Sequence, residues 1–169
     1  MKLWIIYKNG IGFSKIIAEM LQDSLEEFID VAVGEAKKID PALLVEEKLD
    51  YMIVGDIISK EIPSLDIQNW LLKYREVSKK KIKVISVFNV VLTDISVNSF
   101  WVKFLQDNVI AETIYPSIIR LKLNKADLAF KNGVHEIVKE YSDKFIEFII
   151  KKIKNKKINK KLSDKEEYL

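Results

Sequence analysis

Apolar runs and amphipathic segments alternate along this sequence. Four short runs are apolar at nearly every position, which is typical of strands that are buried on both faces of a sheet. A fifth run alternates apolar residues with Arg120 and Lys122, as an edge strand does. Between the runs, apolar side chains recur every three or four residues, which indicates helices with one buried side. The expected strands are 3–7, 29–33, 51–55, 82–88 and 118–123, and the expected helices are 15–28, 41–47, 67–74, 97–106 and 134–149.

This order of elements predicts an α/β fold. Parallel strands need long crossover connections, and helices on those crossovers cover both faces of the sheet. The order suits a three-layer, doubly wound arrangement around a five-stranded parallel sheet of order 2-1-3-4-5. We expect one α/β domain over residues 1–150 and a basic tail over residues 151–169.

The first expected strand leads into a loop with two glycines, Gly10 and Gly12, and then directly into a helix. The start of a helix leaves backbone N–H groups unpaired, and the helix dipole favours an anion beside them. Glycines let the backbone approach a ligand without a Cβ in the way. The loop therefore predicts a binding site for an anion such as a phosphate, although two glycines alone also fit a tight turn that holds no ligand.

In this loop the sequence resembles the flavodoxin family, whose Ser/Thr-x-Thr-Gly-x-Thr loop after the first strand wraps the phosphate of FMN. Gly12 matches the family glycine and Ser14 matches the last hydroxyl, whereas Asn9 and Ile11 replace hydroxyl or polar residues. The Asn9 amide can still donate a hydrogen bond, and Lys8 adds a positive charge nearby. The resemblance implies a flavodoxin-like fold and an FMN phosphate site made by Asn9, Gly10, Ile11, Gly12, Phe13 and Ser14.

Longer runs are similar to the menaquinone-dependent protoporphyrinogen oxidase branch of that family. The matching runs are 49–55, 84–91 and 98–105, and the resemblance covers most of residues 2–150. The segment that this branch inserts between the last strand and the final helix is absent here. The resemblance implies an FMN-binding electron-transfer protein or oxidoreductase, whose partner is a redox protein or a quinone- or porphyrin-type small molecule.

Two later loops, 56–63 and 89–94, correspond to the loops that grip the isoalloxazine ring in flavodoxins. Neither contains an aromatic residue beyond Phe88 at the root of the second, so aliphatic side chains would replace aromatic stacking. Backbone N–H groups of both loops would meet the polar edge of the ring. The resemblance implies ring contacts from Ile57, Ile58, Asn89, Val90 and Val91.

The composition limits the chemistry that the side chains supply. The chain has 169 residues, no cysteine and one histidine. This excludes disulfides, thiolate catalysis, cysteine-ligated clusters and histidine-rich metal sites within the chain. Any redox chemistry must therefore come from an organic cofactor. No apolar run approaches the roughly 20 residues needed to cross a bilayer, and no signal peptide is recognisable, so we expect a cytoplasmic protein.

Positive charge is concentrated near the end of the chain. Residues 151–161 contain seven lysines and no acid, whereas the whole chain carries a net charge of +3, so the remainder carries about −4. A solvated helix end is the simplest interpretation of this segment. The alternative is an electrostatic contact of Lys151 to Lys161 with an anionic membrane surface or an acidic partner. We expect no nucleic-acid binding, because no aromatic residues lie between the lysines.

Two other functions share this topology. A flavodoxin-like domain that has lost FMN would serve as an interaction module, and the altered loop positions and missing aromatics favour it. A phosphoacceptor receiver domain would place its accepting aspartate at Asp56. Such a domain needs acidic Mg²⁺ ligands after the first strand, where this chain has Lys8 and Asn9. Asp56 is therefore more simply interpreted as a loop acid or a helix cap.

Overall fold

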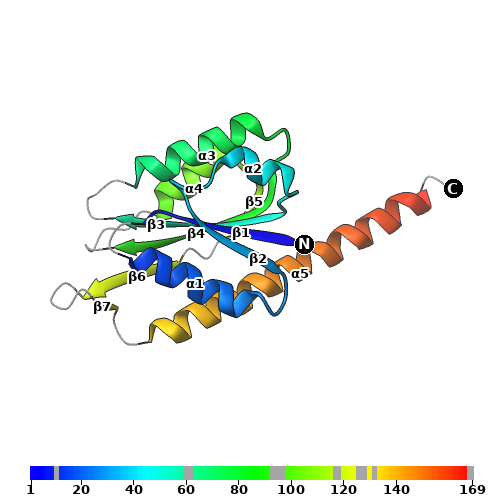
Figure 1. Cartoon of the computed structure of the whole chain (residues 1–169). Coiled ribbons are helices and arrows are strands. Elements are labelled where there is room, and N and C mark those ends of the chain that lie inside the picture. Colours follow the sequence, from blue (N-terminus) through cyan, green and yellow to red (C-terminus); the bar gives the residue numbers. More distant parts are fainter. Residues whose placement is uncertain are drawn as a thin grey trace.

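A mainly parallel sheet runs through the centre of the molecule, between two layers of helices (Figure 1). The computed structural model describes residues 1–9, 12–58, 63–91, 98–115, 119–124, 129–130 and 133–166. In these residues the strands follow the order β2-β1-β3-β4, after which β4 pairs with both β5 and β6. The strands are β1 (Lys2–Tyr7), β2 (Asp30–Glu35), β3 (Tyr51–Ile58), β4 (Ile82–Val91), β5 (Ala111–Ile114), β6 (Ile119–Asn124) and β7 (Ala129–Phe130).

Two segments share the fifth position of the sheet. β5 pairs in parallel with the first part of β4, from Ile82 to Ile85, and β6 pairs in parallel with the last part, from Phe88 to Val91. The predicted order 2-1-3-4-5 is confirmed, but the fifth strand is not the single segment 118–123. The first segment, β5, is short and partly exposed, so its sequence shows no apolar run. The second, β6, is not a free edge, because β7 pairs with it in antiparallel fashion.

The helices confirm the predicted segments, and the helix expected at residues 67–74 extends further at both ends. Asp40 caps α2, because its side chain accepts a hydrogen bond of 3.0 Å from the backbone N–H of Ala42, and Pro41 follows at the first helical position. The last helix, α5, is longer than expected and continues through the lysine-rich tail. No helix within the described ranges is long and apolar enough to span a membrane. The helices are α1 (Phe13–Leu25), α2 (Pro41–Glu46), α3 (Leu65–Val77), α4 (Asn98–Asp107) and α5 (Val134–Glu166).

The helices bury a hydrophobic core on each face of the sheet. α1 and α5 lie on one face, where Ile17 and Phe145 belong to the same buried cluster as residues of β1 and β3 (Figure 1). α2, α3 and α4 lie on the other face, where Trp70 and Trp101 are buried, as expected for packing residues. Alternate residues of each central strand enter opposite cores. This two-sided burial explains why the strand sequences are apolar at nearly every position.

The strand order reverses between β1 and β3. From β1 the chain crosses to β2 on one side of it, and it then crosses back to β3 on the other side. The connections that follow β1 and β3 therefore diverge at the carboxyl ends of these strands. In open α/β sheets, ligands bind at such a reversal of strand order. We call this end of the sheet, where β1, β3 and β4 terminate, the carboxyl edge.

Candidate functional site

Backbone hydrogen bonds tie together the strand ends at the carboxyl edge. The backbone N–H of Lys8 donates to the carbonyl of Gly55 at 2.8 Å, and the N–H of Ala36 donates to the carbonyl of Tyr7 at 2.8 Å. These bonds join the ends of β1, β2 and β3. The loop that precedes α1 therefore starts from a fixed position.

Gly12 precedes α1 in a left-handed backbone conformation, with φ of +87°. Apart from its chain neighbours, no described residue would place a heavy atom within 4 Å of a Cβ built on Gly12, so the space beside it is open. Glycine cannot cap the helix with a side chain, and the first turn of α1 contains no acid. The positive end of the helix dipole therefore lies beside this space, which favours an anion.

Ser14 places a hydroxyl without a partner at the same helix start. Its side chain is fully buried, and Oγ has no hydrogen-bond partner in the described part of the chain. A buried hydroxyl that lacks a partner costs about 1–3 kcal/mol. An oxygen of a ligand bound at the helix start would supply the missing acceptor.

Asn89 is buried at the end of β4, but it faces the layer of α4. Its Oδ1 accepts a hydrogen bond of 3.0 Å from Nε1 of Trp101. Its Nδ2 is buried and has no partner among the described residues. No sequence pattern indicates the contact with Trp101, which occupies the oxygen of the Asn89 amide and leaves its nitrogen available.

Asp56 closes the loop that connects β3 to α3. Its Oδ1 accepts a hydrogen bond of 2.9 Å from the N–H of Ile57, and its Oδ2 accepts one of 2.8 Å from the N–H of Ser64, the residue that precedes α3. The side chain is fully buried. Burial raises the pKa of Asp56 to about 6, although the two N–H donors and Lys8 partly offset the effect. A buried carboxylate whose two oxygens are occupied does not suit a phosphoacceptor. Asp56 is not a loop acid either, because it lies within β3 and its carboxylate reaches the N–H of the residue before α3.

The residues expected at the flavin ring lie in strands rather than loops. β3 continues to Ile58 and β4 continues to Val91, because Ile57 pairs in register with Val90 and Ile58 with Val91. Residues 56–58 and 89–91 therefore do not belong to the expected loops. Val90 and Val91 are fully buried in opposite cores, and β6 pairs with the same part of β4. Ring contact stays a prediction for all five residues, Ile57, Ile58, Asn89, Val90 and Val91. The side chains of the two valines are buried and are not exposed to a ligand.

Some candidate residues lie outside the described part of the chain. They are Gly10 and Ile11 of the phosphate loop, and residues 59–62 and 92–94 of the two later loops. Within the described part, Asn9 and Gly12 lie between β1 and α1, and Phe13 and Ser14 are the first two residues of α1; their contact with a phosphate stays a prediction. Lys8 is directed toward α3, where its Nζ lies 3.5 Å from a carboxylate oxygen of Asp66.

The fold matches solved structures of flavodoxins. Oxidised flavodoxin 1 from Bacillus cereus superimposes with a TM-score of 0.69 at 13% identity, over 87% of this chain and 98% of that one. Flavodoxin 2 from the same organism gives a TM-score of 0.66 at 18% identity, over 87% and 99%. A Fusobacterium nucleatum flavodoxin bound to flavin mononucleotide gives 0.57 at 11% identity, over 86% and 97%.

These likenesses establish the flavodoxin fold and no more, because the identities are low. No protein-family model matches the sequence, and no curated protein matches it. None of the reported neighbours belongs to the menaquinone-dependent protoporphyrinogen oxidase branch.

Proposed function

We propose that this chain binds FMN at its carboxyl edge and transfers electrons through it. The observation that carries the proposal is the start of α1. There, an open left-handed glycine, Gly12, lies close to Ser14, whose buried hydroxyl has no partner among the described residues. A phosphate group fits both features, since it needs space without a Cβ and it accepts hydrogen bonds from a hydroxyl and from N–H groups. Structural neighbours with this fold include a flavodoxin that binds FMN.

In this proposal the chain positions the cofactor, and the flavin carries the redox chemistry. Residues 9–14 hold the phosphate, and the ends of β3 and β4, at residues 57–58 and 89–91, lie at the ring. FMN supplies one- or two-electron transfer when bound. Asp56 acts indirectly, because its two hydrogen bonds hold the ends of the segment between β3 and α3. Asp56 is therefore a positioning residue rather than a catalytic one.

The electron partner that we propose is a redox protein or a quinone- or porphyrin-type small molecule. The support for the small molecules is the similarity of the runs 49–55, 84–91 and 98–105 to the menaquinone-dependent protoporphyrinogen oxidase branch. Two of these runs form buried strand segments, so much of that similarity lies in the core. Direct assays therefore distinguish the acceptors: each class is added to the reduced flavoprotein, and reoxidation of the flavin is followed.

The visible absorption spectrum of the protein tests FMN binding. After addition of excess FMN and desalting, we expect the protein to keep about one equivalent of flavin and to show a flavin spectrum that differs from that of free FMN, because the ring enters a less polar surrounding. A colourless protein after desalting would contradict the proposal. It would favour the other candidate, a flavodoxin-like interaction module that has lost FMN, which the two buried valines at the end of β4 already support.

A further inference from the structure

The opposite edge of the sheet, where β3 and β4 begin, carries a hollow of about 650 Å³. It lies between α2, the end of α3, the residues just before β3 and the start of β4. Its apolar lining includes Leu44, Leu49 and Val77, and the connection from α3 to β4 supplies lysines at its rim. The hollow is therefore apolar inside and basic outside.

Four of the lysines that line this hollow have no acidic partner among the described residues. Lys48, Lys79, Lys80 and Lys81 are exposed, and none of them forms an ion pair with an acid in the described ranges. The positive charge of this rim is therefore unbalanced.

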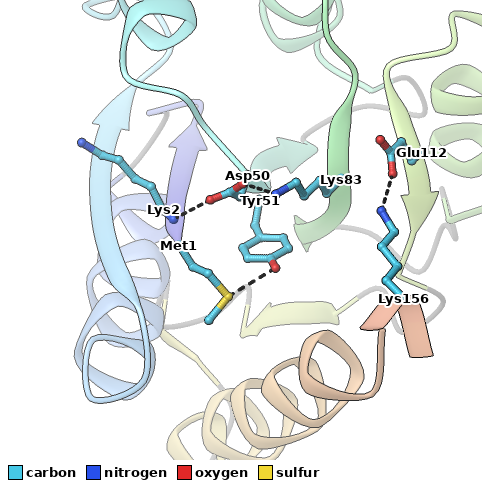
Figure 2. Close-up of polar contacts among 7 residues, drawn as sticks. All are labelled: Met1, Lys2, Asp50, Tyr51, Lys83, Glu112 and Lys156. Carbon is cyan, nitrogen blue, oxygen red and sulfur yellow. Dashed lines mark hydrogen bonds and ion pairs between the residues drawn. The ribbon is translucent and has the colours of Figure 1, made fainter. Parts of the chain in front are cut away.

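The two acids beside the hollow are already paired (Figure 2). Asp50 accepts from Nζ of Lys83 at 2.5 Å and from the backbone N–H of Lys2 at 3.1 Å. Glu112 pairs with Lys156 at 3.1 Å. Neither acid is left to neutralise the rim lysines.

The last part of α5 forms a second basic wall. Nζ of Lys152 donates to Oγ1 of Thr113 on β5, and the Lys156 pair with Glu112 continues this attachment. A smaller hollow of about 240 Å³ lies between α5 and the starts of β3 and β4, and Lys157 lines it. Beyond this point α5 leaves the sheet and projects from the body (Figure 1). There, Ile158 and Leu162 are 55% and 56% exposed.

We propose that the corner between these two walls binds an acidic segment of another protein. The basic corner is defined by Lys48, Lys79, Lys80 and Lys81 on one wall and Lys157 on the other, with exposed Ile158 and Leu162 beyond it. Carboxylates would pair with the lysines, and apolar side chains would cover the hollow and the exposed helix residues. The corner lies at the end of the sheet opposite the proposed FMN site, so both sites can be occupied at once.

The shape of the corner favours a protein segment over a membrane. A flat bilayer touches either the edge of the body or the projecting helix, but it does not reach into the angle between them (Figure 1). Nucleic acid is less well matched, because Tyr51 and Tyr74, the aromatic residues that line the two hollows, are buried and present no face for stacking bases.

Binding of a labelled synthetic peptide to the full chain tests this proposal. The probe contains glutamate interspersed with leucine, and its counterpart has glutamine in place of each glutamate. Fluorescence anisotropy should show binding of the glutamate peptide that weakens with added salt, and much weaker binding of the glutamine peptide. The double variant Lys81→Glu/Lys157→Glu reverses one charge on each wall and should weaken binding by roughly tenfold or more. The matched variant Lys73→Glu/Lys103→Glu, with exposed lysines on α3 and α4, should bind as the unchanged protein does.

Three results would overturn the proposal. In the first, both double variants lose affinity equally, which would mean that only the total charge matters. In the second, the glutamine peptide binds as tightly as the glutamate peptide. In the third, vesicles that contain phosphatidylserine, or duplex DNA, bind more tightly than the peptide and respond to Lys81→Glu/Lys157→Glu. All of these measurements are made without FMN, so their failure leaves the proposed function of the carboxyl edge unaffected.

Discussion

Replacing Gly12 with valine is expected to weaken FMN binding by about a hundredfold or more, because the variant would lose several charge-assisted hydrogen bonds to the phosphate. The branched side chain would fill the open space in which we place the phosphate. The residue also sits at φ of +87°, where a β-branched side chain costs on the order of 1–2 kcal/mol. No atom lies close enough to clash, so the variant should fold with reduced stability. Titration of FMN, followed by quenching of its fluorescence, measures the effect.

Gly133→Val provides the matched control for backbone strain. Gly133 precedes α5 with φ of +92°, and among the described residues a Cβ there would meet a carboxylate oxygen of Glu136 at 3.8 Å and nothing nearer. The two variants should therefore lose similar stability, whereas only Gly12→Val should lose FMN affinity. Equal FMN affinity in the Gly12→Val variant and the unchanged protein would show that the phosphate lies elsewhere.

The stability that Asp56 contributes is expected to increase as the pH falls. In the folded protein its pKa is raised to about 6, from an ordinary value of 3.8, because the carboxyl is buried. The folded state therefore binds this proton more tightly than the unfolded state does. The resulting stabilisation is complete below about pH 3.8 and is lost as the pH rises through about 6. As the pH falls between those limits, the free energy of unfolding of the unchanged protein should rise by up to about 3 kcal/mol relative to that of Asp56→Asn. Denaturant unfolding at a series of pH values measures this difference.

Asp50→Asn should show the opposite pH dependence. Partial burial raises the pKa of Asp50, but its hydrogen bonds with Lys83 and with the N–H of Lys2 have a larger effect in the opposite direction. The pKa therefore lies below its ordinary value. The unchanged protein should therefore lose stability relative to Asp50→Asn as the pH falls. If the stability of the unchanged protein relative to Asp56→Asn also fell with falling pH, the carboxyl of Asp56 would not be buried as described.

Most of the fold could be predicted from the sequence because buried parallel strands are apolar on both faces. The runs 51–55 and 82–88 are of this kind, and both form central strands. The pattern of apolar runs did not predict a strand that is only partly buried, or a strand end that depends on pairing with other strands. β5 is partly exposed and shows no apolar run, and the extension of β4 through Asn89 follows from its pairing with β3 and β6.

The sequence predicts those parts of the candidate site that depend on residues close together in the chain. Gly12 and Ser14 could be placed at a helix start because their roles depend on neighbouring residues in the chain. The contact between Asn89 and Trp101 joins two elements that are distant in sequence, and no local pattern reports it. An acid at the end of the apolar run that forms β3 was the one available sign that Asp56 is buried.

Comparison of FMN with riboflavin tests the central claim most directly. Riboflavin has the same ring but lacks the phosphate, so the comparison isolates the site that we place at the start of α1. We expect FMN to bind at least about a hundredfold more tightly than riboflavin, because only FMN supplies acceptors for the first-turn N–H groups and for the Ser14 hydroxyl. Equal affinity for the two molecules, or binding of neither, would contradict the claim that this helix start is a phosphate site.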